Sequence, residues 1–457
     1  MAKAAPSIDT LFSVGPGGAR SFLHPAAAHG RFTRLRHVGF ALLIALFVAL
    51  PFIQINGRPG IWLDIGRRSF HVLGLSVGPT ESLLLFFLVA GSAFTLVVVS
   101  ALWGRVWCGW ACPQTVWLEG VYRRIERLFE GDRAAQLRLE AEPMGLNKLW
   151  RKGGKSLAFL LVSAAIAHLL VCYFVPPRDL WLLMGRGPAS DPEVFFWSAA
   201  LTGLVLFNFA WFREQLCIIL CPYGRLQSVL SDEDTVVVGY DAGRGEPRGK
   251  PGHTKGDCVD CGRCVAVCPT GIDIRQGLQL ECVGCASCID ACDEVMGKLQ
   301  RARGLIRYDS ERGFTGGKRR FLRPRVYAYA AVGLVGLTVA LLAGRTRPEI
   351  PVSLVRQVGM PFVVESGKVR NSYLLRTANK SEAAQTLSIE VTPGLAGASV
   401  TLPRNVWTLP AGESAAIPVF VEVPKESFAA PFDVTVRVQD QTGRKAELHA
   451  QFLGPGR

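Results

Sequence analysis

Residues 258–292 read Cys258-Val-Asp-Cys261-Gly-Arg-Cys264-Val-Ala-Val-Cys268-Pro269 and, after a short link, Cys282-Val-Gly-Cys285-Ala-Ser-Cys288-Ile-Asp-Ala-Cys292. Both runs have the spacing C-x2-C-x2-C-x3-C, so eight thiols lie within 35 residues. Two intervening residues let three thiolates converge on one concave loop, and this density of soft ligands predicts a metal-binding module.

The spacing is that of a chain holding two [4Fe–4S] clusters, in which the fourth Cys of each run binds the other cluster. We therefore predict one cluster on Cys258, Cys261, Cys264 and Cys292. The second cluster would be held by Cys268, Cys282, Cys285 and Cys288. Exchange of the fourth ligand would tie the two runs into one pseudo-symmetric ferredoxin-like module.

Two other interpretations of these cysteines are weaker. Zinc knots use C-x2-C pairs but rarely two full four-Cys runs in tandem. A disulfide framework needs an oxidising compartment, which the topology argued below does not give. Asp293 stands where the second run usually has Pro, a departure that leaves the ligands unchanged.

The composition is that of a membrane protein with several domains. The chain has 457 residues, a formal net charge of +14 and 49% hydrophobic residues, and its mean hydropathy is +0.25. Its basic residues flank apolar stretches and do not form one patch with interleaved aromatic residues, so nucleic acid is not an expected partner. No cleavable signal peptide is evident, and no G-x-G-x-x-G or P-loop is present.

Five apolar stretches are each long enough to cross a bilayer as a helix. They are His37–Ile55, Ser82–Leu102, Ser156–Val175, Glu193–Phe212 and Val326–Ala343. Loop 105–155 carries ten Lys/Arg, against three in loop 56–79 and two in loop 176–192. The positive-inside rule then predicts that the N-terminus, loop 105–155 and residues 213–325 are cytoplasmic, where reduced thiols persist.

The segment after the fifth span has a different pattern. Apolar and polar residues alternate in 387–392, 432–439 and 446–452, between turn signals at Pro393-Gly394, Ala411-Gly412 and Thr442-Gly443. Period-two runs at short spacing predict an antiparallel β-sandwich. This domain would lie outside the membrane, and we expect a docking role because it shows no catalytic constellation. His449 falls on a polar face and gives no case for a ligand.

A second set of thiols lies outside the ferredoxin runs. The motif C-x3-C-P occurs as Cys108…Cys112-Pro113 and as Cys217…Cys221-Pro222, each after an inward-running span. On a helix, residues i and i+4 are too far apart for a disulfide but suit two thiolates on one soft ion such as Cu(I). Small buried apolar residues are the plain alternative, and the sequence does not decide between one site and two.

Other polar and aromatic residues in or near the spans carry weaker hypotheses. Cys172 is unpaired in the third span and is expected in the core. His168 and Asn208 lie inside spans, where we expect interhelical hydrogen bonds. Trp103, Trp107 and Trp110 suggest an interfacial belt, and 116–129 suggests a helix on the membrane surface.

Several stretches together resemble the CcoG/FixG/RdxA family of accessory proteins for cbb3-type cytochrome c oxidase. They are Ala101–Trp117, Arg213–Tyr223, Gly245–Gly249, Cys268–Ile274, Ala291–Met296 and Arg303–Tyr308. The resemblance implies a multidomain membrane protein with a five-helix transmembrane region, a ferredoxin-like 2[4Fe–4S] module and a C-terminal all-β immunoglobulin-like sandwich. The corresponding boundaries are a leader 1–36, four helices with both C-x3-C-P motifs in 37–225, the module in 226–318, a fifth helix in 319–345 and the outer domain in 346–457.

The resemblance also implies a function at the bacterial inner membrane, with the module cytoplasmic and the sandwich periplasmic. The protein would be a cupric reductase or electron carrier for oxidase assembly, with copper-delivery and assembly factors as partners and an undetermined electron donor. On this view Cys108, Cys112, Cys217 and Cys221 are the catalytic residues, with copper as a further cofactor. The alternatives are a quinol-linked relay like NapH and NosR, and a non-redox assembly scaffold.

Overall fold

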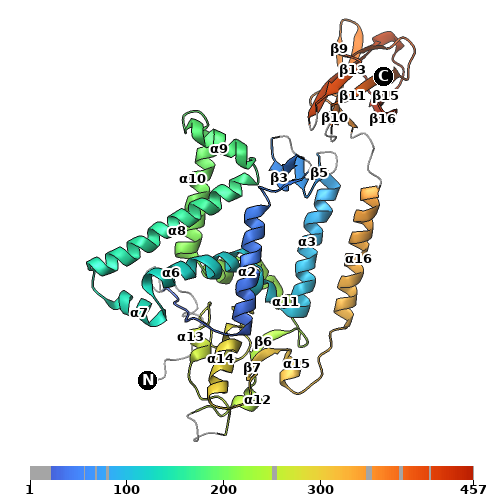
Figure 1. Ribbon diagram of the computed structural model, residues 1–457. Coiled ribbons are helices and arrows are strands. Elements are labelled where there is room, and N and C mark those ends of the chain that lie inside the picture. The colour runs from blue at the N-terminus through green and yellow to red at the C-terminus, as the bar shows by residue number, and fades with distance from the viewer. Residues whose placement is uncertain are drawn as a thin grey trace. The chain divides into compact units, whose positions relative to one another are not determined.

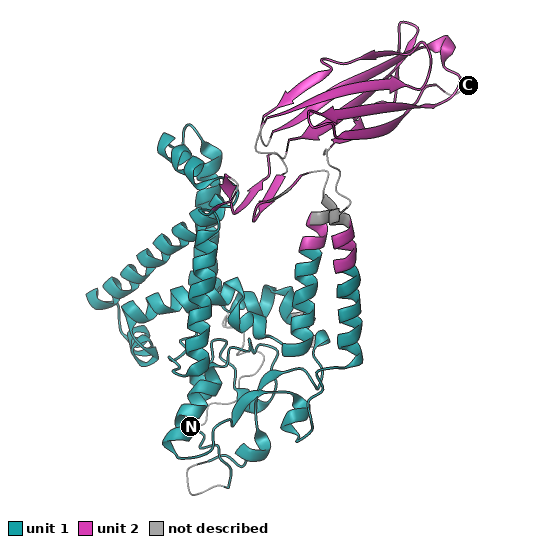
Figure 2. Ribbon diagram, turned by 45° about the vertical axis from the view of Figure 1, so that its right-hand side comes forward, with its two compact units in different colours: residues 1–53, 89–336 teal, residues 54–88, 337–457 magenta. Residues whose placement is uncertain are grey.

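The structure is a computed structural model that describes residues 22–55, 57–66, 69–78, 82–249, 255–345, 352–379, 384–410 and 413–455 (Figure 1). The chain divides into two compact units, shown in different colours in Figure 2. Unit 1 comprises 1–53 and 89–336, and unit 2 comprises 54–88 and 337–457. The cysteine-rich module and most of the apolar helices belong to unit 1.

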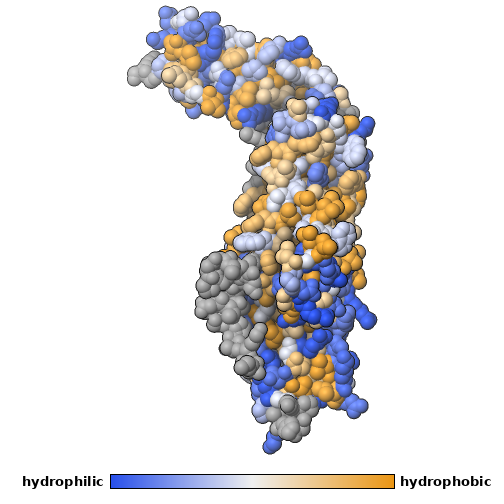
Figure 3. Space-filling model, turned by 90° about the vertical axis from the view of Figure 1, so that its left-hand side faces the viewer, coloured by the Kyte–Doolittle hydropathy of each residue, from blue (hydrophilic) through white to orange (hydrophobic). Residues whose placement is uncertain are grey.

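Five helices are long and apolar enough to cross a membrane, as the sequence predicts. They are α2 (Arg31–Ala49), α3 (Ser82–Trp103), α8 (Leu146–Cys172), α10 (Pro192–Leu206) continued by η3 (Phe207–Phe212), and α16 (Pro324–Arg345). Their apolar side chains are largely exposed, as those of a lipid-facing helix are. Hydrophobic side chains cover the middle stretch of the visible face in Figure 3, and hydrophilic ones become frequent toward its lower end.

Shorter helices connect these spans in unit 1. They are α4 (Val106–Trp110), α5 (Pro113–Trp117), η2 (Leu118–Tyr122), α6 (Arg123–Glu130), α7 (Arg133–Ala141), α9 (Pro177–Arg186), η4 (Leu216–Leu220) and α11 (Pro222–Leu230). From α5 to α6 the helix is continuous over 113–130, with a π-helical turn at η2.

The ferredoxin module (226–318) is built on one antiparallel strand pair and small helices. Strand β6 (Val237–Tyr240) pairs with β7 (Ile306–Asp309). The helical elements are α12 (Ala242–Gly245), α13 (Arg263–Ala266), η5 (Ile274–Gln276), α14 (Ser287–Lys298) and α15 (Glu311–Phe314). Ile272, Ile289, Leu305 and Ile306 form a core that also contains Cys258 and Cys264.

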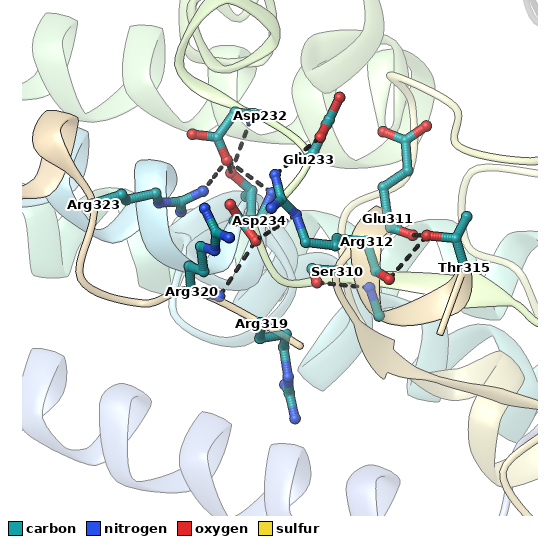
Figure 4. Close-up of polar contacts among 12 residues, drawn as sticks. Asp232, Glu233, Asp234, Ser310, Glu311, Arg312, Thr315, Arg319, Arg320 and Arg323 are labelled. Atoms are coloured by element: carbon teal, nitrogen blue, oxygen red, sulfur yellow. Dashed lines mark hydrogen bonds and ion pairs between the residues drawn. The ribbon is translucent and has the colours of Figure 1, made fainter. Parts of the chain in front are cut away.

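A group of ion pairs joins the two ends of the ferredoxin module to the base of α16 (Figure 4). Arg323 pairs with Asp232, and Arg312 lies 3.1 Å from Glu233 and 3.2 Å from Asp234. Arg323 also donates to the carbonyl of Ala101 at 2.8 Å, near the end of α3. These contacts hold the module against the spans.

Unit 2 contains the predicted β-sandwich. One sheet has the order β12-β14-β10-β8, with β9 also on β10, and the other has the order β13-β11-β15-β16. The strands are β8 (Val352–Arg356), β9 (Val363–Glu365), β10 (Lys368–Ala378), β11 (Gln385–Pro393), β12 (Ser399–Thr401), β13 (Val406–Leu409), β14 (Ser414–Pro424), β15 (Phe432–Asp440) and β16 (Lys445–Phe452). A short 3-10 turn, η6 (Lys425–Ser427), follows β14.

The period-two runs in the sequence account for this core. Val434, Val436 and Val438 of β15 are buried and alternate with more exposed residues. They pack with Val419 and Val421 of β14, so side chains from both sheets fill one interior. The predicted sandwich is therefore confirmed, and its three predicted strands β11, β15 and β16 share one sheet.

Unit 2 also includes the connection between the first two spans. Its strands form a two-stranded and a three-stranded antiparallel sheet, β1-β2 and β3-β4-β5. They are β1 (Gln54–Ile55), β2 (Arg58–Pro59), β3 (Ile61–Asp64), β4 (Ser69–Val72) and β5 (Leu75–Val77).

The predicted leader 1–36 lies partly outside the described residues, which begin at Phe22. Within it, α2 begins at Arg31 and contacts the ferredoxin module, so the first span starts before His37. The stretch 116–129 is helical, as expected. Its Tyr122 and Arg123 are buried, at 0% and 2% exposure, because α6 packs against α8 and Arg123 donates to the carbonyl of Pro269 in the module.

Candidate functional site: two cysteine-lined cavities and a second set of thiols

The two cysteine loops have the same backbone conformation. In each, the residues before and after the middle Cys are left-handed: Asp260 and Gly262 have φ of 51° and 67°, and Gly284 and Ala286 have φ of 65° and 61°. Consecutive turns of this kind wrap the chain around a concave space and point backbone N–H groups inward. The repeated geometry is the structural counterpart of the repeated sequence spacing.

Two cavities open inside these loops. The first is lined by Cys258, Cys261, Cys264 and Cys292, and by Met296 and Leu305 among others. The second is lined by Cys268, Cys282, Cys285 and Cys288, with Ile272 and Ala286 on its apolar walls. Each cavity therefore brings together the four cysteines assigned to one cluster from the spacing, and Cys264 borders both.

The donor chemistry of these cavities fits a polynuclear iron–sulfur cluster. All eight cysteines are free thiols, and only Cys261 among them is exposed. Within the described residues no three Cys, His, Asp or Glu side chains lie close enough to hold one metal ion. Four thiols held further apart than a single ion allows suit a cubane, whose corners are separate iron atoms.

Burial controls the ionisation of these thiols. It raises the pKa of Cys264, Cys282 and Cys292 to about 12 from an ordinary value of 9.0, and neighbouring thiolates act in the same direction. These three thiols therefore stay protonated at neutral pH, and metal binding would displace their protons.

Two arginine side chains dock the loops of the second cavity onto helices α2 and α6, and Tyr308 of β7 braces the same loops from within the module. Arg36 of α2 donates to the carbonyl of Gly109 and to Ser287 Oγ, both at 3.0 Å. Arg123 of α6 donates to the carbonyl of Pro269 at 3.0 Å. Tyr308 donates to the carbonyl of Gly284 at 2.6 Å.

The first C-x3-C-P motif lies directly against the second cavity. A Cβ atom placed on Gly109 would lie 2.6 Å from the carbonyl oxygen of Val283 and 2.8 Å from Cα of Cys285. Only a glycine allows this approach, because any side chain would displace the cluster loop. The loop and the motif thus touch through their backbones.

The structure brings the two C-x3-C-P motifs together. We name Cys108, Cys112, Cys217 and Cys221 the paired motif cysteines. Burial raises the pKa of Cys108 to about 12, and the other three thiolates contribute in the same direction. Arg105 opposes this rise at Cys108 and also at Cys217. Since such effects act only at short range, the four thiols share one neighbourhood.

A cavity of about 390 Å³ is lined in part by α6 and lies among buried ionic groups. Its walls include Glu126, Lys155 and Arg213, together with the apolar side chains of Phe159 and Leu206. Arg213 pairs with Glu126, and both are at most 3% exposed.

The remaining predicted residues have mainly structural contacts. Cys172 is buried in an apolar cluster, as expected. Asn208 exchanges hydrogen bonds with Gln114 of α5 and so links two helices as expected. His168 instead bonds the carbonyl of Ala164 within its own helix, so the expectation of an interhelical bond is wrong. Trp110 donates to Tyr308 at 3.1 Å and belongs to the contact with the module, not to an aromatic belt.

Family models match three parts of this chain. A 4Fe–4S dicluster domain matches residues 212–311, and a 4Fe–4S binding domain matches residues 84–131. The immunoglobulin-like fold at the C-terminus of FixG matches residues 340–455. The ferredoxin module, the first motif and the sandwich are thus each covered.

The chain is 34% identical to the nitrogen fixation protein FixG of Rhizobium meliloti, over 96% of this chain and 93% of that protein. The chain belongs to the FixG/RdxA family. Protein RdxA of Cereibacter sphaeroides is 33% identical over 95% of this chain and 98% of that protein. The ferredoxin-type protein NapH of Escherichia coli is 24% identical over 58% of this chain and 87% of that protein. This FixG-family chain is a membrane iron–sulfur electron-transfer protein.

Sequence reasoning missed the residues that connect the site to its surroundings. Arg105 and Gly109 stand inside the first motif region, yet nothing in the spacing shows that they face the cluster loop. Arg123 looked like a surface cation because its neighbours Arg124 and Arg127 are also basic. A buried arginine and a glycine of close approach depend on long-range partners, which a single sequence does not reveal.

Proposed function

We propose that this protein reduces Cu(II) to Cu(I) during assembly of a cbb3-type oxidase. The observation that carries the proposal is the backbone contact between Gly109 and the Val283–Cys285 loop, which puts a soft-ligand thiol site next to the second cavity. Thiolates are the ligands that Cu(I) prefers among protein side chains.

The eight ferredoxin cysteines would hold the electron carriers. Cys258, Cys261, Cys264 and Cys292 would bind one [4Fe–4S] cluster, and Cys268, Cys282, Cys285 and Cys288 the other. When bound, each cluster stores one electron. Cys261 is exposed whereas Cys285 is buried against the first motif, which supports entry of electrons at the first cavity from a low-potential one-electron donor and exit at the second.

The paired motif cysteines would form the site at which electrons leave the protein. A cupric ion that arrives as substrate takes up one electron and leaves as Cu(I), so each reduced cluster suffices for one ion. Because no three candidate ligands in the described ranges converge on one ion, a copper ion would use at most two of these thiols, a coordination that suits Cu(I).

The charge distribution supports one orientation in the inner membrane. Ten Lys/Arg in 105–155 favour a cytoplasmic position for this loop and for the ferredoxin module. The immunoglobulin-like domain would then be periplasmic, where it could meet copper-delivery and assembly factors.

Cupric reduction can be tested on the purified full-length protein. The clusters are reduced anaerobically with dithionite, excess reductant is removed, and Cu(I) is measured with a Cu(I)-specific chelator after Cu(II) is added. We expect Cys108→Ser/Cys217→Ser to lower the rate at least about tenfold, with Cys172→Ser as the matched control. An unchanged rate in the double variant would remove these thiols from the exit.

A quinol-linked relay is the second candidate, favoured by the cavity beside α6. Its apolar walls suit a quinol ring, and the partly exposed Glu140 carboxylate would pass the two protons released on oxidation to water. Addition of a short-chain quinol should then bleach the cluster absorbance, and Phe159→Trp, which adds bulk to the cavity wall, should slow it. If only a soluble donor bleaches the clusters, the relay is excluded.

A further inference from the structure

The two C-x3-C-P motifs have the same local structure. In each, the first Cys lies in a single helical turn, α4 or η4, and the second is the N-cap of a helix that begins with Pro, α5 or α11. Proline suits the first helical position because its missing N–H would have no partner there. The chain thus presents two equivalent pairs of thiols.

Hydrogen bonds tie each motif to the flank of the other. Arg105, ahead of Cys108, donates to Gln227 of α11. Gln114, behind Cys112, donates at 2.9 Å to the carbonyl of Arg213, ahead of Cys217. Tyr223 of α11 bonds Ser100 at the end of α3. The two motifs therefore lie side by side.

The four thiols are the same number and kind of ligand as each ferredoxin cavity provides. As in those cavities, no three of the thiols are close enough for a single ion, since no such group occurs among the described side chains. The family model described as a 4Fe–4S binding domain covers 84–131. In this chain that range holds only two cysteines, Cys108 and Cys112, whereas a cubane takes four. The second motif supplies the missing two.

We propose that Cys108, Cys112, Cys217 and Cys221 together hold a third [4Fe–4S] cluster. The two motifs would contribute two ligands each, just as the two ferredoxin runs share their ligands. This inference revises one detail of the proposed function: with all four thiols bound to a cluster, a cupric ion would take its electron from that cluster and would not bind the thiols. The reduction of Cu(II) itself does not depend on this inference, and the two are tested by different measurements.

The surroundings of the thiols fit an anionic cluster. Backbone N–H groups of Gln114 and Thr115 point at the sulfur of Cys112. The Arg105 guanidinium, which is 8% exposed, acts on both Cys108 and Cys217. Hydrogen bonds to sulfur and a nearby cation are the features with which proteins stabilise clusters and set their potential.

The position of the site is consistent with a chain of three carriers. Arg105 acts electrostatically on Cys282 as well as on Cys108. A Cβ atom on Gly284 would lie 3.2 Å from the Arg105 backbone, and Gly109 meets Cys285. The proposed third cluster would thus follow directly after the second cavity.

Metal analysis of the full-length protein decides the question. We expect anaerobically purified protein to contain about twelve iron and twelve sulfide per chain, since each cubane holds four of each. Cys108→Ser/Cys217→Ser should lower both numbers to about eight while the EPR signals of the ferredoxin clusters persist. Cys172→Ser, a buried cysteine outside the motifs, should keep about twelve.

Three results would overturn the proposal. They are about eight iron in the wild type, an unchanged iron content in the double variant, and bound copper in place of the third set of iron atoms. The wild-type count needs no variant, so the proposal can fail even if the double variant does not fold. Because no acceptor is involved, loss of cupric reduction alone would leave this proposal standing.

Discussion

Asp290 of the ferredoxin module caps the first turn of α2 by bonding Thr33. Its Oδ2 atom accepts from the backbone N–H of Thr33 at 2.6 Å and from the Thr33 hydroxyl at 2.7 Å, and Oδ1 accepts from the N–H of Phe32 at 3.2 Å. The helix has no cap of its own because its N-cap is Gly30. Asp290 stands between Cys288 and Cys292, so a span is anchored directly on the helix that carries these two predicted ligands.

Asp290→Ala should loosen this anchor. Loss of a carboxylate cap costs about 1–2 kcal/mol, and we expect faster hydrogen exchange at the amides of 31–36. Asp290→Asn retains an acceptor oxygen and should restore most of the protection. Glu294→Ala, on the exposed side of the same helix, is the matched control. Equal exchange in Asp290→Ala and wild type would show that the cap does not hold the helix.

Gly109→Ala should slow electron transfer without loss of iron. The added Cβ would meet the carbonyl of Val283 at 2.6 Å, so the motif and the cluster loop must separate. Small displacements at a reacting centre reduce rates strongly, and we expect the reoxidation of dithionite-reduced protein by Cu(II) to be about tenfold slower or more.

The control for this variant is Gly203→Ala in α10, where no atom lies within 4 Å of the added Cβ. Both variants should contain as much iron as the wild type. Wild-type reoxidation kinetics in Gly109→Ala would mean that electrons do not cross this contact.

Glu126→Gln should destabilise unit 1 far more than a surface substitution. It would leave the Arg213 guanidinium buried without its partner, and such a change typically costs about 3–5 kcal/mol. The double variant Glu126→Leu/Arg213→Met removes both charges and should recover most of this loss. The melting temperatures of the two variants in detergent can be compared by thermal unfolding followed by tryptophan fluorescence. Equal stability of Glu126→Gln and of the double variant would contradict the prediction.

The ion pair between Glu126 and Arg213 also predicts that the stability of the protein depends on pH. Burial raises the pKa of Glu126, but the charge and hydrogen bond of Arg213, with Lys155 and Arg123, outweigh burial and hold it below its ordinary 4.5. The stabilisation is therefore complete above pH 4.5 and is lost as the pH falls through the lower folded-state pKa. The melting temperature should decline in that acid range for the wild type, and less steeply for Glu126→Gln.

The sequence was sufficient for features that depend on local pattern. The cysteine spacing predicts the two sets of four that line the cavities, because two-residue intervals leave few ways to arrange three thiols on a loop. Length and hydropathy predict the five spans, and the alternation in 432–439 predicts a strand buried on one face.

The sequence alone does not predict features that depend on partners distant in the chain. The pattern in 116–129 gives a helix but not its neighbours, so burial of Arg123 against Pro269 could not be foreseen. The meeting of the two C-x3-C-P motifs rests on bonds such as that from Arg105 to Gln227, across more than a hundred residues. His168 had an acceptor available within its own helix, and spacing alone does not show which bond forms.

Arg105→Gln should lower the reduction potential of the carrier next to the first motif. The guanidinium is 8% exposed and acts on Cys108, Cys217 and Cys282. Reduction adds a negative charge, which a nearby cation stabilises, and glutamine keeps a hydrogen-bonding side chain but not that charge. A shift on the order of 60 mV corresponds to a tenfold change in the one-electron equilibrium. A potentiometric titration followed by EPR measures it, with the exposed Arg34→Gln as control, and an unchanged or higher potential would show that Arg105 does not tune the carrier.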